Sequence, residues 1–263
     1  MIDDENKDSK WMDAVKLEMD NVKVAFEIYG GNVSDLIGYK EITGHLVFDV
    51  KLGENFRRKA RYCADGHKTD TPASVTYSSV VSRDSVRIIL TIAALNGLDV
   101  MGADIQNAFL SAPVREKVWI KAGPEFGANQ GRNLIVVRAL YGLKSASASF
   151  RAHMASRLDE LGFKSSVADP DVWLKAATKA CGEQYYEYVM VYVDDILAVS
   201  IEPRAVLKEI QKTFKFKNDK IEEPSSYLGA RLARKSINGI ECWTITSVDY
   251  IRAAIDTVET AIK

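Results

Sequence analysis

The sequence is poor in cysteine and lacks any long apolar run. Its 263 residues include three cysteines, Cys63, Cys181 and Cys242, which are scattered without the spacing of a metal site. An odd, scattered set does not form a disulfide framework, so we expect a reducing compartment. No apolar run approaches the roughly 20 residues of a membrane span. The polar, acidic first eight residues are also unlike a signal or transit peptide. We therefore expect a globular protein without a membrane partner.

The sequence also has almost no net charge, at −1, which gives no global argument for a nucleic-acid partner. The local distribution is more informative. Residues 51 to 68 carry six basic against two acidic side chains; the basic residues are Lys51, Arg57, Arg58, Lys59, Arg61 and Lys68. Such a patch on a neutral protein can contact phosphates, or it can be the solvated face of a hairpin. Both interpretations stay open at this point.

Apolar spacing along the chain predicts alternating helices and strands. The expected helices cover residues 10–27, 82–96, 146–161 and 203–214, and the expected strands cover residues 46–51, 56–63, 100–105, 118–121, 134–140, 185–193, 196–200, 226–233 and 240–245. From residue 100 to 233 this order reads β–α–β–β–α–β, with an insertion after the first strand. That order is typical of a ferredoxin-like, split-βαβ domain in an α+β protein.

Two adjacent aspartates, Asp194 and Asp195, lie where the predicted hairpin of residues 185–200 must turn. Aspartate suits a turn because its side chain hydrogen-bonds nearby backbone, and that simple interpretation accounts for the pair alone. Both flanks are apolar enough to be buried, however, and two carboxylates on a buried hairpin repel each other unless a cation lies between them. Oxygen ligands of this kind suit Mg²⁺ or Mn²⁺.

The topology predicts that a third carboxylate reaches this turn. Right-handed crossovers make the first and second strands parallel, with room for the third between them. Asp104, at the end of the first strand, then arrives at the edge where Asp194 and Asp195 lie. The alternative is that Asp104 only caps a strand.

Three carboxylates on neighbouring strands can hold two divalent ions about 3.5–4 Å apart. Such ions promote the in-line attack of a hydroxyl on phosphorus. We expect Asp104 and Asp194 to bridge the ions, with the backbone carbonyl of Ile105 as a further ligand. Because the side chain of Asp195 leaves the chain on the other side, its role is left open.

Three strings occur in an order and at separations that resemble the reverse transcriptases of copia-type LTR retrotransposons (pseudoviruses). The strings are residues 104–110 (Asp-Ile-Gln-Asn-Ala-Phe-Leu), residues 140–144 (Leu-Tyr-Gly-Leu-Lys) and residues 192–195 (Tyr-Val-Asp-Asp). The resemblance extends from about residue 11 to residue 250. It implies a right-hand polymerase fold and RNA-directed DNA polymerase activity with two Mg²⁺ or Mn²⁺ ions. The implied substrates are an RNA or DNA template with its primer and deoxynucleoside triphosphates. The resemblance further implies association with other domains of a retroelement polyprotein and an intracellular location, either a cytoplasmic particle or the nucleus.

In the palm of that fold, the resemblance makes Asp104, Asp194 and Asp195 the catalytic, metal-binding carboxylates. Phe109 matches the bulky residue that lies under the incoming sugar, where its ring would crowd a 2′-hydroxyl and favour deoxynucleotides. The alternative for Phe109 is an ordinary core position.

In the fingers, Lys59 and Arg61 match the hairpin that grips the triphosphate, in keeping with charge-assisted contacts to phosphate. Arg57 and Arg58 lie beside them and compete for that role. The resemblance does not decide which of the four makes the contact.

Tyr141, Gly142 and Lys144 match the loop that backs the nucleotide and the template base. Gly142 would permit close approach of the backbone, or it is a plain turn glycine. Tyr227, Leu228 and Gly229 match the primer-gripping turn.

The resemblance also predicts how the chain is divided. We expect an N-terminal helix and fingers (1–80), a first palm segment (81–111), a fingers insertion (112–144), a second palm segment (145–235) and a truncated thumb (236–263). An active polymerase domain is the leading interpretation. A catalytically inactive remnant that only binds nucleic acid, or another palm-type enzyme such as a nucleotidyl cyclase or a viral RNA polymerase, are the alternatives. Phe109 and the three strings argue against the last.

Overall fold

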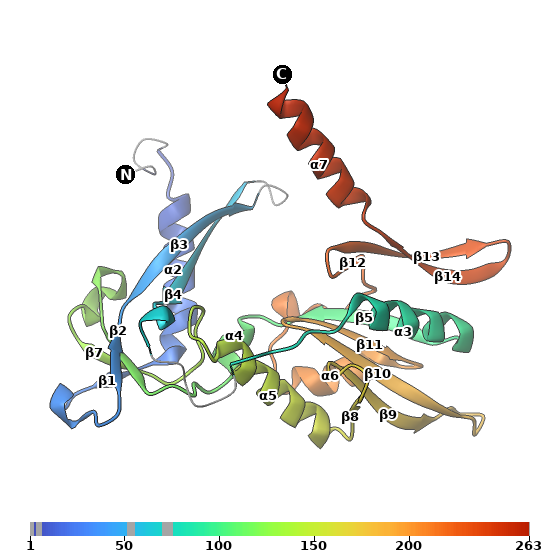
Figure 1. Cartoon of the computed structure of the whole chain (residues 1–263), viewed down its shortest axis with the longest axis horizontal. Coiled ribbons are helices and arrows are strands. Elements are labelled where there is room, and N and C mark those ends of the chain that lie inside the picture. The colour runs from blue at the N-terminus through green and yellow to red at the C-terminus, as the bar shows by residue number, and fades with distance from the viewer. Residues whose placement is uncertain (1–2, 4–6, 52–55, 70–75, 263) are drawn as a thin grey trace. The chain divides into compact units, whose positions relative to one another are not determined.

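The computed structural model describes residues 3, 7–51, 56–69 and 76–262, and it is a mixed α and β protein (Figure 1). The α+β class expected from the sequence is therefore confirmed. The chain forms two compact units, which we call the first unit (Met1–Ser78 and Asn107–Met154) and the second unit (Ser79–Gln106 and Ala155–Lys263). In the described part of the chain no helix combines the length and the apolar character needed to cross a membrane.

The first unit combines a helix, a long hairpin and a four-stranded sheet. Its sheet has the order β1-β7-β6-β2, and β3 pairs with β4 as the predicted basic hairpin, whose expected turn at residues 53–55 lies outside the described residues. The elements are α2 (Lys10–Val22), β1 (Phe26–Tyr29), β2 (Lys40–Ile42), β3 (Gly44–Lys51), β4 (Arg57–Ala64), α4 (Ala108–Ser111), β6 (Val118–Lys121), β7 (Asn133–Val136) and the start of α5 (Ala146–Glu160).

The helix predicted for residues 10–27 is too long at its C-terminal end. The structure ends α2 at Val22, inserts a 3₁₀ turn over Lys23–Ala25, and begins β1 at Phe26. Phe26 pairs with Val136, more than a hundred residues away. Its apolar spacing fits a helix as well as a strand, so the pairing with β7 decides its conformation, and that pairing has no local signal.

The second unit is built on a five-stranded sheet with the order β5-β11-β10-β9-β8, and on a smaller sheet with the order β12-β13-β14. Its elements are α3 (Arg83–Asn96), β5 (Asp99–Asp104), the end of α5, β8 (Lys164–Ser165), β9 (Val172–Thr178), β10 (Gln184–Tyr192), β11 (Asp195–Ser200), α6 (Pro203–Gln211), β12 (Ser226–Tyr227), β13 (Ala230–Ile237), β14 (Ile240–Thr246) and α7 (Val248–Ala261).

The strand arrangement that carries the carboxylates is the expected one. Strand β11 pairs antiparallel with both β10 and β5, so β5 and β10 run parallel with β11 between them. Strand β5 therefore ends at the edge where the β10–β11 turn lies. The sequence pattern placed this edge correctly from right-handed crossovers alone.

The expected fourth strand of this sheet is wrong. Residues 226–233 form β12 and the start of β13, which pair with each other and with β14 rather than with β5. The outer edge of β5 instead meets a non-strand segment through two isolated bridges, Ile105 with Phe216 and Gly102 with Glu222. The strand β9, which pairs along β10, was not predicted. A tight two-residue turn at Leu228 and Gly229 favours the local β12–β13 pairing over the distant edge.

Helix α3 supplies much of the core of the second unit. Ser82 caps its first turn by accepting a hydrogen bond from the Ser85 backbone, and Gly97 ends it in the left-handed conformation at φ 61°. Its buried face packs with inward residues of β10 and β11 and with Tyr227 and Leu232 of the smaller sheet. This packing fixes the β12–β13 turn beside α3 within one compact unit.

Candidate functional site

The β10–β11 turn consists of Val193 and Asp194. Tyr192 pairs with Asp195 across the hairpin, so Asp195 is the first residue of β11 rather than part of the turn. This corrects the expectation that both aspartates occupy the turn. Val193 adopts a left-handed conformation at φ 53°. For a β-branched residue that conformation is an outlier that costs about 1–3 kcal/mol, and surrounding structure must hold it.

The end of β5 pairs with β11 and hydrogen-bonds to this turn. Asp104 pairs directly with Asp195 in the ladder, and the Ile105 backbone N–H donates to the carbonyl of Asp194 at 2.8 Å. Directly opposite residues of an antiparallel pair project to the same face of the sheet. The structure thus brings the backbones of the three predicted aspartates together, and it places Asp104 and Asp195 on one face. The Ile105 residue itself is 2% exposed.

A cleft of about 290 Å³ lies against this face. Asp104 and Asp195 line it together with Lys217, Lys220 and Glu222. Asp194 is not among the residues that line the cleft. The pairing of carboxylates around the cleft is therefore Asp104 with Asp195, whereas the sequence argument paired Asp104 with Asp194.

The cleft concentrates negative charge that its surroundings only partly balance. Burial, with the neighbouring charges of Asp194 and Asp104, raises the pKa of Asp195 to about 6, and Lys217 opposes that shift. The Lys217 ammonium lies 3.2 Å from Asp104 Oδ2. Lys217 was missed by sequence reasoning because it is 113 residues from Asp104 and has no local motif around it.

The cleft suits a divalent cation by its chemistry. Within the described residues, no three His, Cys, Asp or Glu side chains are arranged to hold a metal ion. Asp104 and Asp195 nevertheless offer carboxylate oxygens, the donors that Mg²⁺ and Mn²⁺ prefer. The raised pKa of Asp195 reports negative charge that an added cation would relieve. These two residues therefore fit a metal ion.

In the first unit, three predicted nucleotide-binding residues form one cluster. The Arg61 guanidinium lies 5.3 Å from the centre of the Tyr141 ring, and the Tyr141 and Phe109 rings are 4.8 Å apart. Arg58 instead lies over Trp11 at 5.4 Å, away from this cluster. Lys59 shares the face of β4 with Arg61, because residues two apart on a strand project to the same side.

The loop after β7 is held against β4 within the same unit. Gly142 has φ 90°, and a Cβ added there would collide with the Ala64 backbone. The Ala64 N–H donates to the carbonyl of Tyr141 at 2.7 Å. The Lys144 ammonium donates to the Thr69 carbonyl at 2.6 Å. Gly142 thus serves a close backbone approach inside the protein, and Lys144 is engaged with backbone in this conformation.

The predicted primer-gripping turn divides into a buried and an exposed part. Tyr227 is 4% exposed, and its hydroxyl donates to the Met190 carbonyl at 3.3 Å. Burial raises the pKa of Tyr227 well above its usual value. Leu228 and Gly229 follow in left-handed conformations, at φ 54° and 71°. Only the turn backbone and the Leu228 side chain are therefore open to a ligand.

The comparison with protein families decides which family this chain belongs to. Residues 31–261 match the family model described as reverse transcriptase (RNA-dependent DNA polymerase). The chain is a member of the reverse transcriptase family. The resemblance to copia-type retrotransposon enzymes, recognised from the three strings, is thereby confirmed together with the relatives described next.

Two of the curated relatives are transposon polyproteins of plants. Over 243 residues the chain is 28% identical to the "Retrovirus-related Pol polyprotein from transposon RE1" of Arabidopsis thaliana, a match that covers 87% of this chain and 16% of the relative. A tobacco relative, from transposon TNT 1-94 of Nicotiana tabacum, is 26% identical over 194 residues and covers 71% of this chain and 14% of the relative. The matched part of the chain thus spans about 16% and 14% of the length of these two polyproteins.

A solved structure of a foamy viral protease-reverse transcriptase in complex with double-stranded DNA is also similar to the chain. It covers 85% of this chain and 34% of that chain, with 13% sequence identity. Its TM-score is 0.49, below the level at which a shared fold is established.

Proposed function

We propose that the chain is the polymerase part of a copia-type retrotransposon polyprotein and acts as an RNA-directed DNA polymerase. The observation that carries the proposal is the pairing of Asp104 with Asp195 at the mouth of the cleft, in a chain that belongs to the reverse transcriptase family. In this proposal the second unit corresponds to the palm with the start of the thumb, and the first unit to the fingers. The substrates are deoxynucleoside triphosphates and a primer annealed to an RNA or DNA template.

The chemistry at the cleft is nucleotidyl transfer to the 3′-hydroxyl of the primer. Asp104 and Asp195 would hold the divalent ions, with Asp194 as a further carboxylate at the turn. When bound, such ions favour deprotonation of the attacking hydroxyl and stabilise the leaving oxygen. Lys217 offers an ammonium beside Asp104 that can pair with this carboxylate or with a phosphate oxygen. The strands on either side of the partly buried turn hold the carboxylates in place, so they need little rearrangement during the reaction.

The first test is primer extension on an RNA template with deoxynucleotides and Mg²⁺. We expect Asp104→Asn to lower the rate by about a thousandfold, because several kcal/mol of charge stabilisation correspond to roughly three decades. The exposed helix residue Asp256, which lies outside the cleft, gives a matched control, and Asp256→Asn should extend normally. Circular dichroism must show that both variants fold. Near-normal extension by Asp104→Asn would contradict the proposal.

An inactive remnant that only binds nucleic acid is the second candidate. Within the described residues, the absence of any three acidic, cysteine or histidine side chains arranged for a metal is the observation that favours it. The same experiment separates the two candidates. A wild-type chain that binds the primer–template but adds no nucleotide, with either Mg²⁺ or Mn²⁺, is a remnant.

We also propose that Phe109 selects the sugar of the incoming nucleotide. Its half-buried ring is held by Tyr141 in the cluster with Arg61. We expect Phe109→Val to raise ribonucleotide over deoxynucleotide use by about tenfold, the scale on which one or two methylenes change pocket discrimination. The ratio of kcat/KM for the two sugars measures this. An unchanged ratio would make Phe109 a core residue.

A further inference from the structure

Strand β4 has one partner strand and one outer edge. Among the described strands it pairs with β3 alone, in a two-stranded sheet. Two backbone N–H groups on its outer edge are satisfied from elsewhere in the first unit. The Ala64 N–H donates to the Tyr141 carbonyl at 2.7 Å, and the Tyr62 N–H donates to the Glu18 carboxylate at 2.9 Å. The side chain of Glu18 therefore takes a place that a neighbouring strand would otherwise fill.

Helix α2 brings Glu18 to this edge. The helix lies against the β3–β4 hairpin in the first unit (Figure 1). Trp11, near its start, meets the Phe48 ring edge-on at 5.3 Å, and the Arg58 guanidinium lies over the Trp11 ring. Glu18 follows Trp11 by seven residues, close to two helical turns, so both side chains leave the same side of the helix. Packing of this side against the hairpin holds the carboxylate in place.

Two basic residues of β4 lie within electrostatic reach of this carboxylate. Burial raises the pKa of Glu18, while the hydrogen bond from Tyr62 and the positive charges of Lys59 and Arg61 oppose that shift. Lys59 and Arg61 share one face of β4, and the Arg61 guanidinium lies 5.3 Å from the centre of the Tyr141 ring. Glu18 is thus a negative charge of the protein itself beside the two predicted triphosphate-binding residues.

The edge of β4 does not need a charged acceptor. A glutamine has the same length, and its amide oxygen accepts a backbone N–H equally well. Burying a carboxylate costs more free energy than burying an amide, so the charge needs a further reason. Its effect beyond the hydrogen bond is electrostatic, because it lowers the positive potential that Lys59 and Arg61 present to an incoming polyanion.

We propose that Glu18 is a built-in counter-charge that limits how tightly Lys59 and Arg61 bind the triphosphate of the incoming nucleotide. The inference rests on the proposed function and deepens it, because it adds a residue that sets the affinity of that site. Glu18 is a positioning residue, since it acts through the two cations and touches no reacting atom. A limit on affinity favours turnover, because the pyrophosphate product carries the same anionic groups and must leave after each addition.

The first test is calorimetric titration with inorganic tripolyphosphate at pH 8 in chelator, where the carboxylate is ionised. Glu18→Gln keeps an acceptor for the Tyr62 N–H and removes the charge. We expect its Kd for tripolyphosphate to fall about fivefold, the scale of one unit charge at a partly screened site, and the difference to shrink as salt is added. Circular dichroism must show that the variant folds.

The matched control is Asp20→Asn on the same helix. Asp20 is exposed and pairs with Lys23 at 3.2 Å, and its substitution changes the net charge by the same amount as Glu18→Gln. We expect its Kd for tripolyphosphate to equal that of the wild type. Equal tightening in both variants would show an effect of net charge alone and would overturn the inference.

Primer extension gives the second test. Glu18→Gln should lower the KM for deoxynucleotides by a similar factor without raising kcat, whereas loss of a purely structural group would raise KM or leave it unchanged. A KM and a tripolyphosphate Kd that are unchanged or higher in Glu18→Gln would overturn the inference and leave the proposed function intact. Absence of tripolyphosphate binding by both the wild type and Glu18→Gln would also overturn it. A wild type that adds no nucleotide would contradict the proposed function itself, whatever the titration shows.

Discussion

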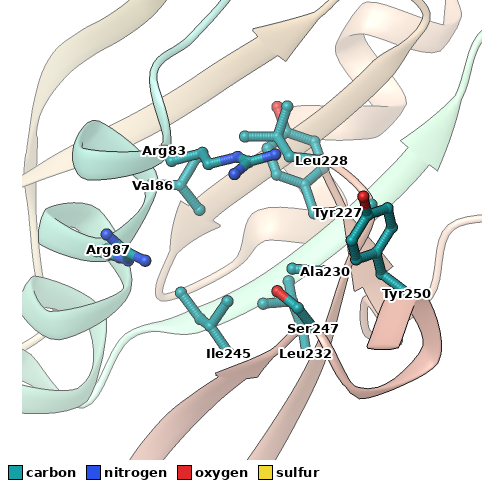
Figure 2. A pocket seen from close by; sticks show the side chains of 11 residues that line it. Arg83, Val86, Arg87, Tyr227, Leu228, Ala230, Leu232, Ile245, Ser247 and Tyr250 are labelled. Atoms are coloured by element: carbon teal, nitrogen blue, oxygen red, sulfur yellow. The ribbon is translucent and has the colours of Figure 1, made fainter. Parts of the chain in front are cut away.

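Two turns of the second unit share a backbone feature and differ in charge. The β10–β11 turn places Val193 at φ 53°, and the β12–β13 turn places Leu228 at φ 54°. Beside the first lie Asp104 and Asp195, with carboxylates that repel each other. Beside the second lies Arg83, and none of the described residues that line the hollow of about 510 Å³ at this turn (Figure 2) is acidic.

The two turns therefore differ in the sign of the charge that each would attract. A carboxylate turn attracts cations and so prepares a place for the reacting phosphate. A turn beside guanidinium groups attracts phosphates directly. Strained backbone at both turns is a cost that a fold retains where surrounding packing overrides it, and such positions are often functional.

The largest expected difference between the two turns is the kinetic quantity that a substitution lowers, which is kcat at the β10–β11 turn and the affinity for primer–template at the β12–β13 turn. We expect Asp194→Asn to lower kcat by about a thousandfold, with the affinity for primer–template nearly unchanged, because it removes a carboxylate from the reacting centre. Leu228→Ala should instead weaken primer–template binding about fivefold and leave kcat near normal, since roughly 1 kcal/mol of apolar contact is lost. Steady-state kinetics with separately measured affinities distinguish these outcomes. If both variants lost mainly kcat, the two turns would not have separate roles.

A smaller effect concerns stability and pH. The pKa of Asp195 is raised to about 6, against an ordinary value of 3.8. Between these values the folded protein keeps a proton that the unfolded chain has lost, so the free energy of unfolding falls as pH rises from about 4 to 6. After allowance for solvent screening of a partly exposed group, we expect a fall of about 1–2 kcal/mol from this residue.

Urea unfolding in chelator at several pH values measures this fall. Asp195→Asn should lack it and should be the more stable protein above pH 6. Adding Mg²⁺ should stabilise the wild type more than the variant, because a bound ion stabilises the folded state. A wild type and variant with parallel pH profiles would show that the Asp195 carboxyl is not perturbed.

The smallest expected effect compares the strain at the two turns. Val193→Gly relieves a left-handed β-branched residue and should stabilise the protein by about 1 kcal/mol, after the entropic cost of glycine. Leu228→Gly relieves similar strain but removes a side chain packed against the core of the second unit, so its net effect should be near zero. Urea midpoints of both variants at pH 7 test the contrast. Equal stabilisation would mean that Leu228 contributes no packing.

The sequence was sufficient to predict those helices and strands whose signals lie within the element itself. The helix expected over residues 82–96 is α3 (Arg83–Asn96), which Ser82 caps and Gly97 ends. The β10–β11 hairpin and the convergence of Asp104 on it followed from strand order and crossover handedness. The parallel arrangement of β5 and β10 confirms that part of the argument.

The misses involve pairings without a local signal. Phe26 was assigned to a helix because its strand conformation depends on pairing with the distant strand β7. The segment that forms β12 was assigned to the larger sheet, whereas it pairs with the neighbouring strand β13. The ion pair of Lys217 with Asp104 and the cavity beside Arg83 join residues far apart in the sequence. Spacing rules describe one element at a time, so such long-range constellations need the assembled structure.

The path of the chain between the two units has a consequence for its synthesis. The chain contributes residues to the first unit up to Ser78, passes into the second unit, returns to the first at Asn107 and leaves it again after Met154. Emerging from a ribosome, it cannot complete the first unit until residue 154 is made, and the early segment with Asp104 must wait for its β11 partner. A fragment that ends at Ser78 holds only part of the first unit, whereas one that ends at Met154 holds the whole first unit and only residues 79–106 of the second. The order of the chain thus lets the first unit be completed before the second.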